Sequence, residues 1–162
     1  MGKYWGKIAV IAVIGFPFGF TTTKTKVTEA REAVLSGATE IDMVININAV
    51  KDGNWKRIEN DICQVVKAVA PVGVKVIMET GFLTEDELFK SCQAAERAGA
   101  CFIKTATGFG LRGAELHDLS IIKRAIGDRL KIKASGGIHD FETAIAMLNA
   151  GADRIGTSSG LE

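Results

Sequence analysis

Short apolar runs rich in β-branched residues alternate with helix-like segments along almost the whole 162-residue chain. Successive runs are centred roughly 23 to 33 residues apart, a spacing typical of repeated strand–helix units that form a parallel sheet. The predicted strands span residues 8–15, 40–47, 74–79, 101–105, 130–134 and 153–157. The predicted helices span about residues 24–36, 54–70, 84–99, 114–126 and 140–150. The alternation therefore predicts the α/β fold class with one parallel sheet.

Helix-end signals support these boundaries. Thr84 and Glu87 have the spacing of a capping box, in which each side chain binds the other's backbone N–H. Glycines follow four of the predicted helices, at the position where a left-handed cap is favoured. They are Gly37, Gly99, Gly127 and Gly151.

The number of strand–helix units limits the architecture. An eight-unit barrel usually needs about 200 residues or more, and only six strands are predicted here. We therefore expect one domain over residues 1–162, either an open six-stranded sheet or a (β/α)8 barrel that lacks some units. The residues at the two ends, Met1-Gly2 and Leu161-Glu162, have the character of cloning residues and are left out of this argument.

Composition excludes several classes of function. The chain has 20 Lys and Arg against 19 Asp and Glu, which argues against nucleic acid or an anionic membrane as the main partner. The apolar run over residues 8–14 is too short to cross a bilayer. Three cysteines without a C-x-x-C pair and two histidines predict neither a disulfide framework nor a metal site. The default compartment is the reducing cytoplasm.

Polar residues interrupt strands that should be apolar on both faces in a parallel sheet. Each one alone is explained by a satisfied ion pair or by a strand end that reaches water. As a set they indicate a site, because ligands bind at the carboxyl ends of parallel strands. These residues are Glu40, Asp42, Lys75, Glu79, Lys104, Lys131 and Lys133.

Two of the lysines suggest a covalent chemistry. A lysine amine becomes nucleophilic near neutral pH when burial or a neighbouring cation lowers its pKa. Lys104 and Lys133 end consecutive predicted strands, so we expect them to be neighbours. One could form a Schiff base with a carbonyl substrate, while Asp42 transfers protons. This is the logic of a metal-free aldolase.

Two glycine- and serine-rich loops are candidates for phosphate binding. Ser135-Gly136-Gly137-Ile138 follows the fifth predicted strand, and residues 156–160 (GTSSG) follow the sixth. Glycines let backbone N–H groups converge on an anion, and serine hydroxyls add donors. The loops after the last two strands often hold phosphate in barrel enzymes.

With these residues in view, the chain closely resembles the deoxyribose-phosphate aldolase family. The resemblance runs in order through residues 8–160. The matching stretches are VIGFPFG (13–19), GATEIDMVINI (37–47), VKVIMETGFLT (74–84), GACFIKTATGF (99–109), KIKASGGI (131–138) and GADRIGTSSG (151–160).

The resemblance implies a (β/α)8 barrel that cleaves 2-deoxyribose 5-phosphate to acetaldehyde and glyceraldehyde 3-phosphate. The substrates would be phosphosugars and small aldehydes, the intermediate a lysine Schiff base, and no cofactor would be needed. By motif, Lys104 would form the Schiff base, Lys133 would perturb it, and Asp42 would relay protons. The implied phosphate site comprises Gly108, Gly136, Gly137, Ser158 and Ser159.

The sequence departs from the family pattern in two ways. Ala106 stands where the family usually has serine, which removes one hydroxyl and leaves the chemistry intact. The resemblance also covers only the family's strands three to eight, so we expect an incomplete barrel of about six strands. Its first and last strands would be unpaired edges, which favour association. We therefore expect a homo-oligomer that pairs these edges, with cleavage activity weakened or lost.

Three alternatives remain open from the sequence. Residues 108–113 read G-x-G-x-x-G, as in dinucleotide-binding enzymes, but the next predicted strand ends without the acidic residue that such sites require. Another phosphate-binding barrel, such as an isomerase or a different Schiff-base aldolase, is the second. A non-catalytic, self-associating fragment of the aldolase is the third.

Overall fold

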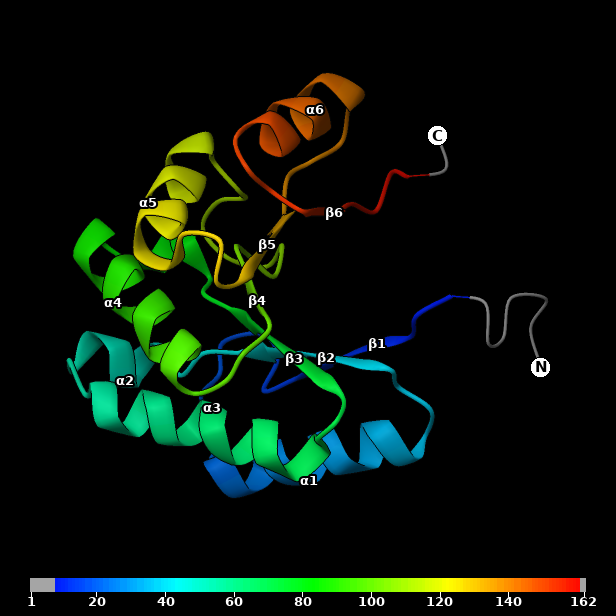
Figure 1. Ribbon diagram of the computed structural model, residues 1–162, viewed down its shortest axis with the longest axis vertical. Helices are drawn as coiled ribbons and strands as arrows, with labels where there is room; N and C mark the ends of the chain where they lie inside the picture. Colours follow the sequence, from blue (N-terminus) through cyan, green and yellow to red (C-terminus); the bar gives the residue numbers. More distant parts are fainter. Residues whose placement is uncertain (1–7, 161–162) are drawn as a thin grey trace.

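The computed structural model describes residues 8–160, so Met1-Gly2 and Leu161-Glu162 lie outside the described residues. Six parallel strands form one sheet in sequential order. The sheet curls into a half-barrel, with β1 and β6 at its two ends (Figure 1). The strands are β1 Ile11–Ile14, β2 Glu40–Val44, β3 Gly73–Ile77, β4 Phe102–Lys104, β5 Lys131–Ser135 and β6 Arg154–Gly156. The expected incomplete barrel of six strands is confirmed.

The helices follow one another around the outside of the curved sheet (Figure 1). They are α1 Thr23–Leu35, α2 Ile47–Lys51, α3 Trp55–Val69, α4 Glu85–Arg97, α5 Leu116–Ile126 and α6 Phe141–Asn149, with a 3-10 turn, η1, at Thr80–Phe82. The predicted capping box is present, since Thr84 N donates to Glu87 Oε2 at 2.7 Å and Glu87 N to Thr84 Oγ1 at 3.3 Å. The four predicted cap glycines all have positive φ.

The core lies between the convex side of the sheet and the helices. A row of apolar residues crosses the first five strands in register, and each member is at most 2% exposed. The row consists of Ile14, Met43, Val76, Ile103 and Ile132. Ile58 and Ile62 of α3 and Leu119 and Ile122 of α5 belong to the same core. Strand residues between these positions face the concave side.

Two predicted boundaries are wrong at the ends of strands. Residue 47 was expected in the second strand, but β2 ends at Val44 and Ile47 begins α2. The Asn46 side chain caps α2 by accepting from Ala49 N at 3.0 Å. An asparagine between two isoleucines hides this helix start from a hydrophobicity pattern. Glu79 was likewise expected in the third strand, but β3 ends at Ile77 and Glu79 precedes η1.

The first strand is much more exposed than predicted. Residues 8–15 were predicted as a strand of a parallel sheet, whose two faces are usually covered, yet among residues 8–14 only Ile14 is buried, while Ile11 is 37% and Val13 47% exposed. The register places Ile11 opposite Glu40 and Val13 opposite Asp42, so both face the concave side. Within residues 8–160, β1 pairs only with β2, so the sheet does not close into a barrel. These two side chains therefore remain partly exposed on the concave side.

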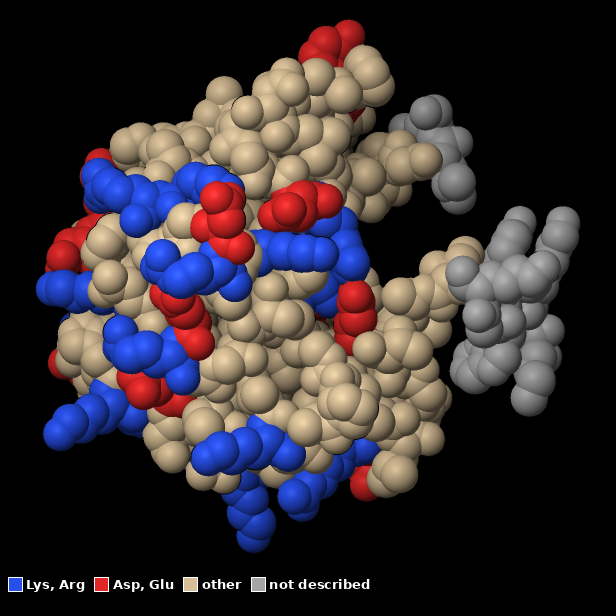
Figure 2. Space-filling model, in the orientation of Figure 1, with Lys and Arg blue, Asp and Glu red and all other residues tan. Residues whose placement is uncertain are grey.

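A buried ion pair fastens α1 to α3. Lys26 is fully buried, and its Nζ lies 2.6 Å from Asp61 Oδ2 and 3.0 Å from the Val44 carbonyl oxygen. On the side of the molecule seen in Figure 1, at the amino ends of the strands, basic and acidic side chains are interspersed (Figure 2). Among the described residues, no helix has the length and apolar character needed to cross a membrane.

Candidate active site

The concave side of the sheet gathers the predicted polar residues. Lys104 of β4 and Lys133 of β5 are register partners. Their Nζ atoms lie 2.9 Å and 3.0 Å from the same oxygen, Oδ2 of Asp42 on β2. Asp42 is 1% exposed and the two lysines are 8% and 7% exposed. The structure therefore brings together three residues that are 29 to 91 positions apart in the sequence.

Charge and burial both affect the pKa values in this trio of Asp42, Lys104 and Lys133. Burial alone would raise the pKa of Asp42, but the charges and hydrogen bonds of Lys104 and Lys133 outweigh it and hold that pKa below its ordinary value. Burial lowers the pKa of Lys133, and the positive charge of Lys104 adds to the effect, against the attraction of Asp42. Asp42 is thus an anion in direct contact with both lysine nitrogens.

The trio continues into a chain of ion pairs toward the amino ends of the strands. Lys75 is fully buried, and its Nζ lies 3.1 Å from Asp42 Oδ1 and 2.6 Å from Glu40 Oε2. Arg154 Nη1 lies 2.7 Å from the same Glu40 oxygen. In this series of ion pairs, two carboxylates face four basic side chains. The excess of positive charge favours the neutral form of a lysine amine. The alternation of β2 and β3 placed Glu40 and Lys75 in the set of polar residues that indicates a site, but sequence reasoning gave neither residue a role of its own.

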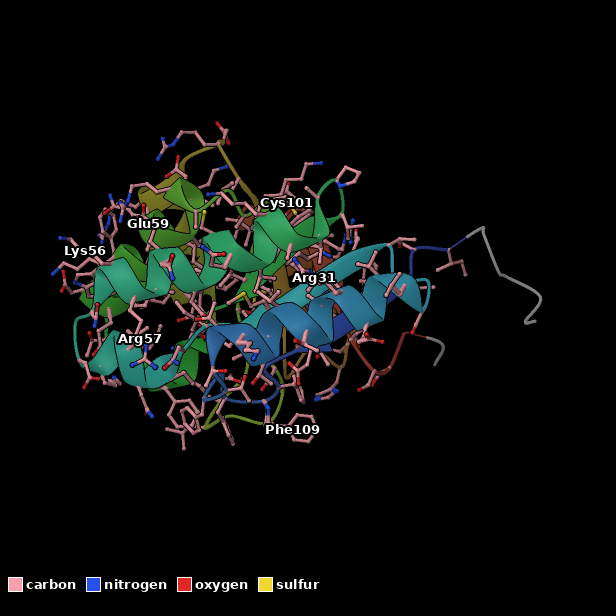
Figure 3. All side chains as sticks on the ribbon, turned by 90° about the horizontal axis from the view of Figure 1, so that it is seen from below. Arg31, Lys56, Arg57, Glu59, Cys101 and Phe109 are labelled. Atoms are coloured by element: carbon pink, nitrogen blue, oxygen red, sulfur yellow. The ribbon has the colours of Figure 1, made fainter. Side chains whose placement is uncertain are left out.

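A cavity of about 590 Å³ opens above the two lysines, at the carboxyl ends of the strands. Its walls are the loops after β4, β5 and β6. Four of the five predicted phosphate-site residues line it, namely Gly108, Gly136, Gly137 and Ser158. The fifth, Ser159, instead lines an adjoining cavity of about 280 Å³ together with His139. Phe109 lies in the loop after β4, and Cys101 lies just before β4. Figure 3 shows these two residues on opposite sides of the molecule.

The loops after β4 and β5 pack too closely for side chains at two glycines. A Cβ on Gly113 would lie 2.3 Å from the carbonyl oxygen of Gly136, which accepts a hydrogen bond from Ala114 N at 3.0 Å. Gly136 itself has a φ of 91°, a region that favours glycine. These glycines are therefore required by the contact between the two loops that form the cavity wall.

Glu79 is a third residue to which sequence reasoning gave no role of its own. It is fully buried, and its Oε2 accepts hydrogen bonds from both the backbone N–H and the hydroxyl of Thr107, in the loop after β4. Burial raises the pKa of Glu79 above its ordinary value. The only signal in the sequence was an acidic residue at the end of an apolar strand, which does not reveal a contact 28 residues away.

Comparison with known proteins identifies the family of the chain. A family model described as DeoC/LacD family aldolase matches residues 4–162. The chain is 51% identical to the deoxyribose-phosphate aldolase of Aciduliprofundum boonei, over 96% of this chain and 71% of that relative. It is 50% identical to the deoxyribose-phosphate aldolase of Thermococcus kodakarensis, over 96% of this chain and 70% of the relative.

Solved structures extend the similarity to the fold. A structure described as an aldolase superimposes with a TM-score of 0.92 at 47% identity, over 95% of this chain and 70% of the other. A tetrameric deoxyribose phosphate aldolase from Aeropyrum pernix superimposes with a TM-score of 0.85 at 32% identity, over 94% of this chain and 64% of the other. These similarities do not favour the non-catalytic alternative. By sequence and by fold, the chain belongs to the DeoC/LacD family of aldolases.

Proposed function

We propose that this chain is a deoxyribose-phosphate aldolase, a lyase that reversibly cleaves 2-deoxyribose 5-phosphate to acetaldehyde and glyceraldehyde 3-phosphate. The observation that carries the proposal is the shared contact of Lys104 and Lys133 with Asp42 Oδ2 below the cavity. The names of the relatives that are about 50% identical support the choice of substrate.

The first step is attack by the Lys104 amine on C1 of the open-chain sugar. Asp42 Oδ2, 2.9 Å away, is placed to accept the ammonium proton, and the nearby Lys133 disfavours a second positive charge. The new N–C1 bond gives a carbinolamine whose oxygen takes a proton. Loss of that oxygen as water leaves an iminium ion between Lys104 and C1.

The iminium ion is the electron acceptor for cleavage. The 3-hydroxyl loses its proton, a carbonyl forms at C3, and the C2–C3 bonding electrons move into the iminium to give an enamine. Glyceraldehyde 3-phosphate leaves. Protonation at C2 and addition of water at C1 then release acetaldehyde and restore the amine. Asp42 and Lys133 supply and accept these protons.

The phosphate of the substrate belongs, in this proposal, to the loops that surround the cavity. Gly108, Gly136, Gly137 and Ser158 line it, and Ser159 is adjacent. Positive φ at three of these positions turns the backbone in a way that lets N–H groups converge on an anion. The distance between this end and Lys104 sets which carbonyl reaches the amine.

We also propose that copies of the chain associate through the unpaired edges of the sheet, at β1 and β6. Ile11 and Val13 expose apolar surface at β1, and exposed apolar strand edges favour pairing. A relative of known structure is described as tetrameric. A monodisperse monomer at micromolar concentration in size-exclusion light scattering would contradict this part. The free thiols of Cys63, Cys92 and Cys101 support the cytoplasm as the compartment.

The activity is tested by following glyceraldehyde 3-phosphate released from 2-deoxyribose 5-phosphate with a coupled dehydrogenase. We expect turnover that EDTA does not inhibit and that Lys104→Leu abolishes. A folded wild-type chain that forms no product would refute the proposed activity and restore the non-catalytic alternative. Turnover that survives Lys104→Leu would refute the assignment of the nucleophile.

A further inference from the structure

Glu79 is a buried carboxyl group that the proposed chemistry does not use. It is fully buried, and its φ of 53° and ψ of 60° lie in the left-handed region. Among residues 8–160 it is the only non-glycine residue with positive φ. A buried carboxyl group and a left-handed backbone are both unfavourable for glutamate, so the stability of the fold does not explain this residue.

The carboxyl group instead holds a loop that lines the cavity. Its Oε2 accepts from Thr107 N at 3.2 Å and also from the Thr107 hydroxyl. The Thr107 hydroxyl oxygen in turn accepts from Phe109 N at 3.0 Å. Three hydrogen bonds therefore connect Glu79, which lies just after β3, to the 107–110 loop, which follows β4. Two of them join Glu79 to Thr107, and the third joins Thr107 to Phe109.

The other oxygen of Glu79 lies against Gly110 in the same loop and leaves no room for a side chain there. Oε1 is buried and has no hydrogen-bond partner within residues 8–160, and a Cβ on Gly110 would lie 2.7 Å from it. Beyond Gly110 the chain is anchored by Arg112, whose Nη1 and Nη2 donate to Asp118 at 2.6 and 2.8 Å. The loop is thus held by polar contacts at Thr107 and at Arg112, and the residues between them line the cavity.

We propose that Glu79 is a positioning residue that shapes the 107–110 loop to receive the phosphate of the substrate. The inference rests on the proposed function, which places the phosphate beside Gly108. An ordered loop binds an anion more tightly, because the cost of ordering it has been met during folding. Burial raises the pKa of Glu79, and a neutral carboxyl group can keep both Thr107 hydrogen bonds without repelling a bound phosphate.

The test compares three variants by their affinity for inorganic phosphate and by the kinetics of 2-deoxyribose 5-phosphate cleavage. Glu79→Ala removes the contacts with Thr107, whereas Glu79→Gln keeps an oxygen acceptor for Thr107 and cannot ionise. The matched control is Glu29→Gln, because Glu29 Oε2 accepts from Gly15 N at 2.8 Å in a different loop that does not line the cavity. Labelling of Lys104 by acetaldehyde and borohydride reports the amine chemistry independently of phosphate.

We expect Glu79→Ala to weaken phosphate binding about tenfold or more, and to raise KM more than it lowers kcat. Glu79→Gln should restore binding to within about threefold of wild type, and Glu29→Gln should match wild type. Acetaldehyde labelling of Lys104 should be the same in all four proteins.

Two results would overturn the inference. One is unchanged phosphate affinity in Glu79→Ala, and the other is a parallel loss of phosphate binding and of Lys104 labelling, which would indicate a general structural role. If wild type labels at Lys104 but binds no phosphate, the phosphate assignment fails while the amine chemistry stands. If wild type does neither, the proposed function itself fails.

Discussion

Lys104 and Lys133 are direct register partners on neighbouring parallel strands, and their ammonium nitrogens contact the same oxygen of Asp42 at 2.9 and 3.0 Å. One carboxylate oxygen of Asp42 thus lies between the two lysine nitrogens. Only one of these lysines needs to act as the nucleophile. The pKa of Lys133 is lowered, with burial as the largest cause. This relationship makes proton exchange within the trio possible without solvent.

Asp42→Asn should reduce cleavage of 2-deoxyribose 5-phosphate by about 10²- to 10⁴-fold, the range typical of a lost general acid–base group. The amide keeps the shape of the side chain but cannot accept a proton from either lysine. Steady-state kcat is the measurement, with circular dichroism to establish that the variant is folded. A kcat within about threefold of wild type would show that the protons travel by another route.

Lys26→Met should lower the free energy of unfolding by about 3–5 kcal/mol, because it leaves the carboxylate of Asp61 buried without a counterion. The double variant Lys26→Met/Asp61→Leu should recover most of this loss. Urea denaturation followed by tryptophan fluorescence measures both. Equal stabilities of the single and double variants would mean that the loss comes from packing rather than from the stranded charge.

Glu79→Gln should stabilise the fold at neutral pH but not at acidic pH. The folded-state pKa of Glu79 lies above its ordinary value of 4.5, so the folded protein binds this proton more tightly than the unfolded chain does. Stability is therefore lost as the pH rises from 4.5 through the folded pKa. Glutamine cannot ionise and avoids that loss, worth about 1.4 kcal/mol for each unit by which the pKa is raised.

The pH series for Glu79→Gln needs unfolding curves between pH 4 and pH 8, with Glu29→Gln as the reference. The difference between Glu79→Gln and wild type should grow with pH in favour of the variant. A difference that is independent of pH would show that ionisation of Glu79 does not affect stability.

Val13→Lys should weaken self-association. Val13 is 47% exposed on the concave side of β1, and a charge on an exposed strand edge opposes pairing with another chain. Size-exclusion light scattering over a concentration series should show a shift toward the monomer. A useful control is Leu35→Lys, since Leu35 is 81% exposed at the end of α1, away from the strand edges. The same shift in both variants would argue against an interface at β1.

The sequence was informative about the fold because the periodic patterns of strands and of helices are both visible within a short stretch of sequence. Alternation of apolar runs with capped helices predicts the six parallel strands, and the positions of Lys104 and Lys133 near the ends of consecutive predicted strands predict that the two lysines meet. Asp42 could be assigned to the same place because its strand alternates polar with apolar residues. Each inference needs only the rule that the carboxyl ends of parallel strands share one edge.

Other features depend on contacts that no local pattern records. The cap at Asn46 lies inside an apolar run, so the predicted strand was extended to Ile47 and α2 was not predicted. The exposure of Val13 depends on what lies across the sheet rather than on its neighbours in sequence. Lys75 contacts Asp42 because of the strand register, and Glu79 contacts Thr107 because of the way the loop packs. Neither contact is recorded in the neighbouring sequence.

The central claim is that Lys104 is the residue that forms the Schiff base. Acetaldehyde is added with sodium borohydride, and the reduced adduct is located by peptide mass mapping, with Lys104→Leu as the control. We predict one adduct, confined to Lys104 and lost in the variant. An adduct at Lys133, labelling scattered over surface lysines, or no adduct in the folded protein would contradict the account.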